Sequence, residues 1–388
     1  MGLMENRLMR IFMITERYPP YIGGAPYCVY QMSTGLSRLG HEIVIVTCSA
    51  PNAPEHENID GIKIQRIQYC DFPRLKGVSF IVNALRKSCR LVQEDRADII
   101  HAHSGISGVI GCSCKKATLR PLVLTFHGLI FPDTLTSKIS LTVDRYVTHR
   151  ADFITFDSRP MQEHFIKEFD LAWEKTCYIP NAVDTDLFKP MNVDRKAWGI
   201  NERDICLLYV GRLVKMKGLQ ILLKSFKEAN REVEMLKLLI VGNGPLRDEL
   251  VEKTREYGLG DRVLFLGSIQ PDKLPSIYAA ADIAVLPSAY EGLSRMLLEA
   301  MACGKAVIAS DIPANHELIT NGQDGFLVTP LTPSSLKEAI VTFALNEGLR
   351  EYLGKKAREK VSFEYSASYR ISRILDVYQK VLTASRLS

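Results

Sequence analysis

Short apolar runs alternate with segments of helical spacing along the first part of the chain. Residues 8–14 form an apolar run of strand length, and residues 42–47 are predicted as a second strand. Between them, the apolar positions of residues 27–39 recur at the spacing of a helix. A loop containing Gly23 and Gly24 joins the first strand to this helix. This order makes a βαβ unit, which predicts a parallel, doubly wound sheet.

The same pattern restarts in the second half of the chain. Residues 205–210 have the composition of a buried strand, residues 211–218 that of a Gly-containing loop, and a helix is predicted from Leu219. Further strands are predicted at residues 236–241, 263–266, 283–287 and 306–310. We therefore predict an α/β protein made of two Rossmann-like domains that face each other across a cleft.

The predicted boundaries place the first domain at residues 1–187 and the second at residues 188–365, with a final helix in residues 366–388. A length of 388 residues and a hydrophobic content of 46% are enough for two cores in a globular, soluble protein.

Charge and cysteine content narrow the functional classes. A formal net charge of +5 does not demand a nucleic-acid partner. No apolar run approaches the length of a membrane span, and the first residues lead into a strand rather than a secretory signal, so we expect a cytoplasmic protein. The nine cysteines are scattered, and Cys112 and Cys114 lack a second pair at zinc-ligand spacing, which favours reduced thiols.

Two glutamates flank the predicted start of a helix at residues 291–304. Gly292 permits close backbone approach to a ligand, and the short Ser294 leaves the first N–H groups of the helix accessible to a phosphate. Glu299 is expected two turns inside the helix, roughly 8–9 Å beyond its start. A carboxylate there suits the hydroxyl pair of a ribose.

Glu291 and Glu299, with the context Glu-Ala-Met-Ala-Cys-Gly, resemble the E-x7-E signature of retaining glycosyltransferases with the GT-B fold, family 4. The resemblance covers nearly the whole chain. It implies that Glu291 contacts the transferred sugar, that the backbone of Gly292, Leu293 and Ser294 binds the phosphates, and that Glu299 binds the ribose. It also implies that the first domain is the acceptor side and that the final helix crosses back onto it.

The segment that begins at Gly211 is similar to the G-R-L-x(3)-K-G pattern of the same family. The resemblance makes Arg212 and Lys217 the contacts of the donor diphosphate, with the guanidinium offering two hydrogen bonds to its oxygens. The Asp184-Thr-Asp186 sequence has the form of a metal motif, but it lies in a predicted turn, and we expect neither a metal nor a cofactor.

In the first half of the chain, the resemblance points to Gly23 and Gly24 and to His127 near the donor sugar and the acceptor. The glycine loop is not G-x-G-x-x-G, so it gives no support to a dinucleotide-dependent enzyme. His101 and His103 are expected to form local hydrogen bonds and receive no role.

The predicted function is that of a metal-independent retaining glycosyltransferase. It would move a hexosyl or N-acetylhexosaminyl group from a UDP- or GDP-sugar to a lipid-linked, glycan or polyol acceptor. Ser294 and residues 312–317 depart from the family pattern, which leaves the donor sugar open. A nucleotide-sugar epimerase or hydrolase of the same fold, a pyridoxal-phosphate phosphorylase and a non-catalytic binding module are the alternatives.

A basic, amphipathic segment raises the question of membrane contact. Residues 72–90 place cationic side chains around an apolar stripe, which is the pattern of helices that lie on anionic lipid or, equally, of a solvated surface helix. The cations are Arg74, Lys76, Arg86, Lys87 and Arg90, and the apolar residues are Phe80, Ile81, Val82 and Leu85. We expect peripheral contact with the inner face of the cell membrane as one interpretation, and the oligomeric state stays open.

Overall fold

The computed structural model describes residues 8–21, 23–68, 76–94, 96–127 and 135–387. Its contacts divide the chain into two compact units, Met1–Pro180 with Ala367–Ser388 (unit 1) and Asn181–Ser366 (unit 2). The first boundary lies earlier than the predicted residue 187. The reason is that Asn181 donates to the carbonyl of Leu293, at 3.3 Å, and the N–H of Val183 donates to the carbonyl of Tyr365.

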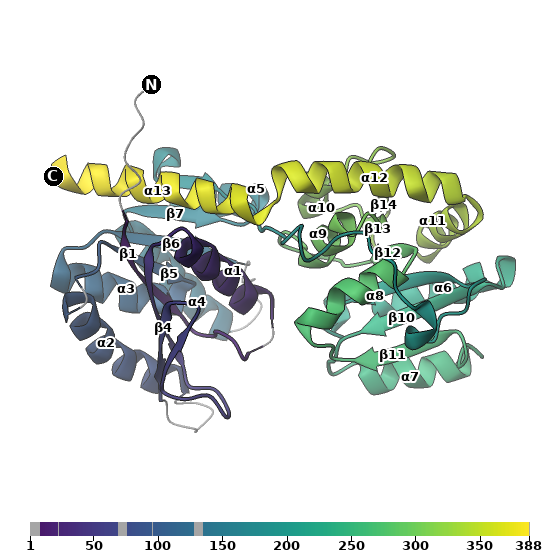
Figure 1. Ribbon diagram of the computed structural model, residues 1–388, viewed down its shortest axis with the longest axis horizontal. Coiled ribbons are helices and arrows are strands. Elements are labelled where there is room, and N and C mark those ends of the chain that lie inside the picture. Colours follow the sequence, from purple (N-terminus) through teal and green to yellow (C-terminus); the bar gives the residue numbers. More distant parts are fainter. Residues whose placement is uncertain (1–7, 22, 69–75, 95, 128–134, 388) are drawn as a thin grey trace. The chain divides into compact units, whose positions relative to one another are not determined.

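Unit 1 contains a sheet of eight strands in the order β3-β4-β2-β1-β5-β6-β7-β8, parallel except for the β3–β4 pair (Figure 1). The strands are β1 (Arg10–Thr15), β2 (Glu42–Cys48), β3 (His56–Ile59), β4 (Ile62–Ile67), β5 (Ile99–His103), β6 (Leu122–Phe126), β7 (Phe153–Phe156) and β8 (Thr176–Tyr178). The helices are α1 (Gly24–Arg38), α2 (Lys76–Glu94), α3 (Gly105–Thr118), α4 (Leu135–Arg150), α5 (Arg159–Phe169) and α13 (Ala367–Leu387).

Unit 2 contains six strands in the order β11-β10-β9-β12-β13-β14. They are β9 (Ile205–Val210), β10 (Leu236–Val241), β11 (Val263–Gly267), β12 (Ile283–Leu286), β13 (Ala306–Ser310) and β14 (Phe326–Val328). The helices are α6 (Leu219–Glu232), α7 (Arg247–Glu256), α8 (Leu274–Ala280), α9 (Arg295–Ala302), α10 (Pro313–Leu318), α11 (Pro333–Leu345) and α12 (Glu347–Glu364). The predicted α/β class with two doubly wound parallel sheets is confirmed.

Both sheets reverse their strand order at one position. In unit 1 the order changes direction between β1 and β5, and in unit 2 it changes between β9 and β12. In open α/β sheets, ligands bind beyond the carboxyl ends of the strands at such a point. The loops that follow these strands are therefore where a site is expected.

The alternation of side chains along β1 builds two cores in unit 1. Ile11 and Met13 join one buried cluster and Phe12 and Ile14 join the other, because successive strand residues point to opposite faces. The first cluster includes residues of both α1 and α13, so the last helix of the chain, yellow in Figure 1, completes the core of unit 1. A side chain at Gly35 of α1 would lie 2.8 Å from Ile371 of α13.

Three details differ from the sequence prediction. Strands β3 and β4 were not predicted, because the many polar residues of 56–67 hide the alternation of apolar and polar positions. Helix α1 begins at Gly24 rather than at residue 27. Helix α9 begins at Arg295, so Glu299 lies one turn and not two turns inside it, about 6 Å along the axis.

The eight cysteines that the structure describes are free thiols. None of the helices in the described ranges is both long and apolar enough to cross a membrane.

Candidate functional site

Three loops of unit 2 meet at the point where its strand order reverses. The N–H of Gly211, after β9, donates to the carbonyl of Val241 at the end of β10. The N–H of Ala289, after β12, donates to the carbonyl of Met216 in the β9 loop, at 2.8 Å. These bonds hold the loops after β9, β10 and β12 as one backbone platform.

Glycines allow these loops to pack backbone against backbone. Gly218 has φ +68°, and a Cβ atom there would overlap the carbonyl oxygen of Pro287. Gly242 has φ +126°, and a Cβ atom there would overlap the carbonyl oxygen of Gly211. Positive φ and close approach both exclude larger residues, so the platform requires glycine at positions 218 and 242.

Lys217 and Glu291 form an ion pair on this platform. Nζ of Lys217 lies 2.5 Å from Oε1 of Glu291, and the side chains are 21% and 10% exposed. Arg212, five residues before Lys217, is exposed, and its carbonyl accepts a hydrogen bond from the hydroxyl of Tyr209. Within the described ranges, the Arg212 guanidinium has no hydrogen-bond or ion-pair partner. One cation is therefore paired and the other is available to an anion.

The segment after Glu291 leads into α9. A Cβ atom on Gly292 would have no neighbour within 4 Å, so the backbone here is open. Ser294 is the N-cap of α9, and its hydroxyl accepts from the N–H of Leu297 at 3.5 Å. Leu293 is buried, and its carbonyl accepts from Asn181. The Ser294 hydroxyl thus accepts from one of the free N–H groups at the start of α9. The prediction had left all of these N–H groups to a ligand.

Glu299 is buried, at 5% exposure, and holds two partners. The hydroxyl of Tyr278 donates to its Oε2 at 2.8 Å, and Arg295 donates to its Oε1 at 2.6 Å. Burial, and next the charge of Glu299, raise the pKa of Tyr278 well above its usual value, so this hydroxyl stays a donor. A carboxylate offers about four acceptor positions, so Glu299 keeps the capacity to accept from a further hydroxyl group.

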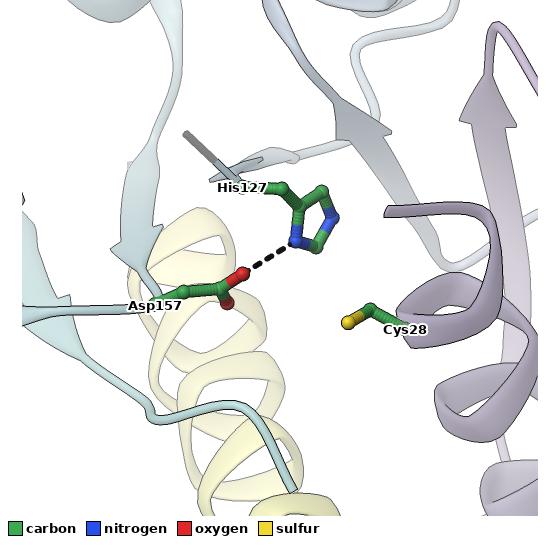
Figure 2. A group of neighbouring side chains, drawn as sticks. All are labelled: Cys28, His127 and Asp157. Carbon is green, nitrogen blue, oxygen red and sulfur yellow. Dashed lines mark hydrogen bonds and ion pairs between the residues drawn. The ribbon is translucent and has the colours of Figure 1, made fainter. Parts of the chain in front are cut away.

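In unit 1, His127 lies directly after β6 and is bonded to Asp157, directly after β7. Nδ1 of His127 is 2.7 Å from Oδ2 of Asp157 (Figure 2). Arg370 of α13 donates to Oδ1 of the same carboxylate at 3.1 Å, and the Arg370 and Asp157 side chains are 3% and 1% exposed. The carboxylate is therefore buried but neutralised.

Two more histidines continue this cluster. Nδ1 of His103 lies 3.1 Å from Nε2 of His127, and the two rings are stacked. His101 bonds to the hydroxyls of Tyr378 and Thr125, at 2.6 and 2.7 Å, as its local role predicted. Burial lowers the pKa of His101 to about 3. The prediction gave His103 no role, but it contacts the candidate residue His127.

The glycine loop reaches the same cluster through α1. Gly23 is the N-cap of α1 and Gly24 is its first residue, with open space around the position of a Cβ atom on Gly24. Cys28, one turn further, points toward His127 and Asp157 in Figure 2. Donor atoms of these three side chains lie within 4.8 Å of one another, close enough to meet one metal ion. Arg370 already supplies positive charge to Asp157, so we assign the group to hydrogen bonding.

Several residues of this arrangement were not predicted from the sequence. The polar residue that follows β7 was a usable signal for Asp157, because residues after parallel strands point into a ligand crevice. Cys28, Tyr278, Arg295 and Arg370 carry no such signal in the sequence. The Asp184 carboxylate accepts from the N–H groups of Asp186 and Leu187, which is the turn that the sequence predicted there.

The basic segment lies partly outside the described residues. Residues 72–75, and the side chains of residues 76–80, are not described. Further along α2, Val82, Arg86 and Arg90 are exposed, whereas Ala84 is buried. Arg90 pairs with Glu94 at 2.6 Å. This part of α2 therefore has one buried face and one cationic outer face.

The sequence of the chain matches known families over both units. Residues 22–187 match "Glycosyltransferase Family 4" and residues 191–360 match "Glycosyl transferases group 1". An uncharacterised glycosyltransferase of Methanocaldococcus jannaschii is 28% identical, with 96% of this chain and 98% of the relative covered. The N-acetyl-alpha-D-glucosaminyl L-malate synthase of Bacillus anthracis is 26% identical, with 94% and 95% covered.

Solved structures share the fold. Sucrose-phosphate synthase from Thermosynechococcus elongatus superimposes with a TM-score of 0.86 at 24% identity, over 97% of this chain and 100% of that chain. HepE of Anabaena, solved in complex with UDP and glucose, gives a TM-score of 0.81 at 23% identity, over 96% and 100%.

Proposed function

Because this chain belongs to the glycosyltransferases of group 1 and family 4, enzymes with the GT-B fold, we propose that it is a metal-independent retaining hexosyltransferase. The donor is a UDP- or GDP-sugar that carries a hexosyl or N-acetylhexosaminyl group. The acceptor is a small polyol, a glycan or a lipid-linked molecule. The observation that carries the proposal is the Lys217–Glu291 pair beside Arg212, on loops at the reversal point of the unit 2 sheet.

The proposed reaction breaks the bond between the anomeric carbon and the donor diphosphate. Negative charge then grows on the leaving diphosphate, and Arg212 and Lys217 meet it together with the backbone of Gly292, Leu293 and Ser294. Lys217 is neutralised by Glu291 until the diphosphate arrives. Two fixed cations and a helix N-terminus replace the charge that a metal ion supplies in other enzymes.

The remaining carboxylates hold the donor. Glu291, next to the open backbone of Gly292, contacts the hydroxyls of the transferred sugar. Glu299 accepts from the ribose, and its bonds to Tyr278 and Arg295 fix the direction of the carboxylate. With no covalent nucleophile assigned, the acceptor attacks from the side of the leaving group, whose phosphate takes the acceptor proton. Positioning and electrostatics then supply the catalysis.

Unit 1 supplies the acceptor side in this proposal. Gly24 offers open backbone at the start of α1, with Gly23 as the N-cap before it, and His127 offers its ring from the end of β6. The name of the Bacillus anthracis relative supports an N-acetylhexosamine donor and a small acceptor, and the HepE complexes support a uridine nucleotide. A relative from Streptococcus pneumoniae, alpha-monoglucosyldiacylglycerol synthase, supports a lipid acceptor.

We further propose a cytoplasmic location with peripheral membrane contact through α2. The cationic outer face of Arg86 and Arg90 beside the exposed Val82 fits the surface of anionic lipid. Sedimentation with anionic and with neutral vesicles measures this contact. Equal binding to both kinds of vesicle contradicts it.

The decisive experiment screens UDP- and GDP-sugars for protection against thermal unfolding and then tests each stabilising donor for transfer. A ligand at 100 times its Kd stabilises by about 2.7 kcal/mol, which gives a clear shift. NMR of the product anomer decides between retention and inversion, and EDTA tests metal independence. Release of free sugar, or an epimerised donor, favours the hydrolase or epimerase. Binding without turnover favours the binding module, and loss of transfer in EDTA with recovery in magnesium or manganese refutes the metal-free mechanism.

A further inference from the structure

A line of hydrogen bonds runs from α13 across three strand ends of unit 1. Arg370 donates to Oδ1 of Asp157 at 3.1 Å, and Oδ2 of Asp157 lies 2.7 Å from Nδ1 of His127. Nε2 of His127 lies 3.1 Å from Nδ1 of His103. Each residue in the line comes from a different element, so the arrangement exists only in the folded unit.

We propose that Asp157 and Arg370 are positioning residues that hold His127 as its Nδ1–H tautomer, which leaves Nε2 as a hydrogen-bond acceptor. In the protein without ligand this nitrogen accepts from Nδ1–H of His103, so a substrate hydroxyl that donates to Nε2 of His127 takes the place of His103. The proposal deepens the proposed function, on which it rests only for the statement that His127 contacts a substrate.

The first reason is the chemistry of the Asp157–Arg370 pair. An ionised carboxylate only accepts hydrogen bonds, so the nitrogen of His127 that faces Asp157 carries a proton. Arg370 stays charged under all ordinary conditions and cancels the charge of Asp157 within the buried pair. The carboxylate thus has its counter-ion already, and His127 has no need of a second proton.

The second reason is the far end of the line. Nε2 of His103 is buried and has no partner in the described part of the chain. If His127 carried protons on both nitrogens, Nδ1 of His103 would have to accept, and its own Nε2–H would be a buried donor without an acceptor. If Nδ1 of His103 donates instead, only a lone pair is left unpaired. The arrangement in which Nδ1 of His103 donates therefore avoids both a buried N–H without an acceptor and an additional buried charge.

The surroundings support a neutral pair of histidines. Burial, and then the charges of His101, His127 and Arg370, hold the pKa of His103 well below its usual value. The rings of His101 and His103 are tilted by 32° with their centres 4.3 Å apart, and Cys28 faces His127 from α1 (Figure 2). Arg370 is thus the positive charge that balances the Asp157 carboxylate in this cluster.

The test reads the tautomer of His127 by ¹H–¹⁵N NMR of the imidazole nitrogens in the full-length protein without ligand, with His127→Gln to assign the signals. We expect a neutral ring with the proton on Nδ1 at pH 7. Asp157→Asn should move the proton to Nε2 in part or in full, because an amide NH₂ can donate to Nδ1. Arg370→Met removes one of the two hydrogen-bond partners of the Asp157 carboxylate and should shift the imidazole nitrogen signals of His127, and Arg370→Lys should restore them.

Arg373→Met is the matched control, since Arg373 is an exposed arginine one turn further along α13. It should leave the His127 signals unchanged. A wild-type ring that is protonated on Nε2 at pH 7 overturns the proposal by itself, even if a variant fails to fold. Unchanged His127 signals in folded Arg370→Met overturn it equally.

Activity adds a second readout once a donor is known. Asp157→Asn should lower kcat on the order of 10²-fold or more, as loss of the correct tautomer does in other enzymes, with the KM for the donor nearly constant. An equal rise in KM without loss of kcat contradicts a positioning role. The correct tautomer in a protein that transfers no sugar refutes the proposed function and leaves this inference standing, so the two failures are distinct.

Discussion

The two units hold their charged groups in opposite ways. In unit 2, Lys217 and Glu291 are partly exposed, at 21% and 10%, and lie on loops. In unit 1, Arg370 of α13 and Asp157 after β7 are at most 3% exposed. A partly exposed pair can exchange its partner for a ligand at small cost, whereas breaking a buried pair leaves an uncompensated charge. The Lys217–Glu291 pair of unit 2 is therefore suited to binding a ligand. The Arg370–Asp157 pair of unit 1 is suited to holding a neighbouring side chain in place.

The packing of the loops leads to the same distinction. The unit 2 platform depends on glycines whose backbones touch, and its site residues come from two short segments, 211–218 and 291–299. The unit 1 cluster joins residues 103, 127, 157 and 370 through side chains. Substitutions in unit 2 should therefore change ligand binding and turnover, and substitutions in the unit 1 pair should change the state of a neighbouring residue.

The largest effect is expected at Arg212, the exposed cation of unit 2. Arg212→Ala should lower kcat on the order of 10²–10³-fold, more than it weakens nucleoside diphosphate binding, because leaving-group charge is largest in the transition state. Arg212→Lys should recover little, since a point charge lacks the planar fork. Steady-state kinetics and calorimetry measure the two quantities.

Lys215→Ala is the matched control for Arg212, because Lys215 is an exposed cation of the same loop. It should stay close to wild type. An unchanged kcat in Arg212→Ala, with only binding weakened, would remove Arg212 from the charge-stabilising role.

A second prediction separates the two glutamates of unit 2. Glu299→Ala should weaken binding of the free nucleoside diphosphate by roughly 1.5–3 kcal/mol, the range for hydrogen bonds to a charged group. Glu291→Gln should leave that binding nearly intact and reduce transfer, because its partner is the sugar. Titration calorimetry with UDP and GDP gives the affinities.

Tyr278→Phe serves as the control for Glu299, since it removes one neighbour of the carboxylate and leaves the acceptor in place. It should cost less affinity than Glu299→Ala. Full nucleotide affinity in a folded Glu299→Ala protein would refute the ribose contact. Equal losses of nucleotide affinity in Glu299→Ala and Glu291→Gln would show that the two glutamates do not have separate roles.

A further prediction concerns the pH dependence of stability in unit 1. Burial, and next the charge of Glu16, raise the pKa of Asp144 to about 7. A raised carboxyl pKa contributes stability that is complete below the unfolded value near 4 and is lost as the pH rises through 7. His101, with its pKa lowered to about 3, has the opposite sign: its contribution is complete above the unfolded value of 6.5 and is lost as the pH falls toward 3.

Asp144→Asn should therefore remove a decline in unfolding free energy on the order of 2–4 kcal/mol between pH 4 and pH 8. Denaturant unfolding of both proteins across this range measures the difference. Parallel pH profiles for the wild type and the variant would show that Asp144 does not titrate near neutrality.

Much of unit 2 was open to prediction because its signals are local. Strands β9, β10 and β13 have the predicted bounds, Ile205–Val210, Leu236–Val241 and Ala306–Ser310, since continuous apolar runs between glycine loops specify buried parallel strands. Arg212, Lys217 and Gly218 all lie within eight residues of the end of β9. A motif of this kind can be recognised from the sequence alone.

The pattern of residues along the chain determined the two doubly wound sheets and the glycine-rich loops, and its resemblance to a known family singled out the candidates Arg212, Lys217, Glu291 and Glu299. Tertiary structure alone decided that Lys217 pairs with Glu291, that Glu299 is buried one turn inside α9, and that Arg370 of the last helix reaches Asp157 beside His127. Periodicity and turn chemistry act over a few residues and can be read along the chain. Pairing across residues 103, 127, 157 and 370 depends instead on which strand ends and helix faces the completed core brings together, and no local pattern encodes that choice.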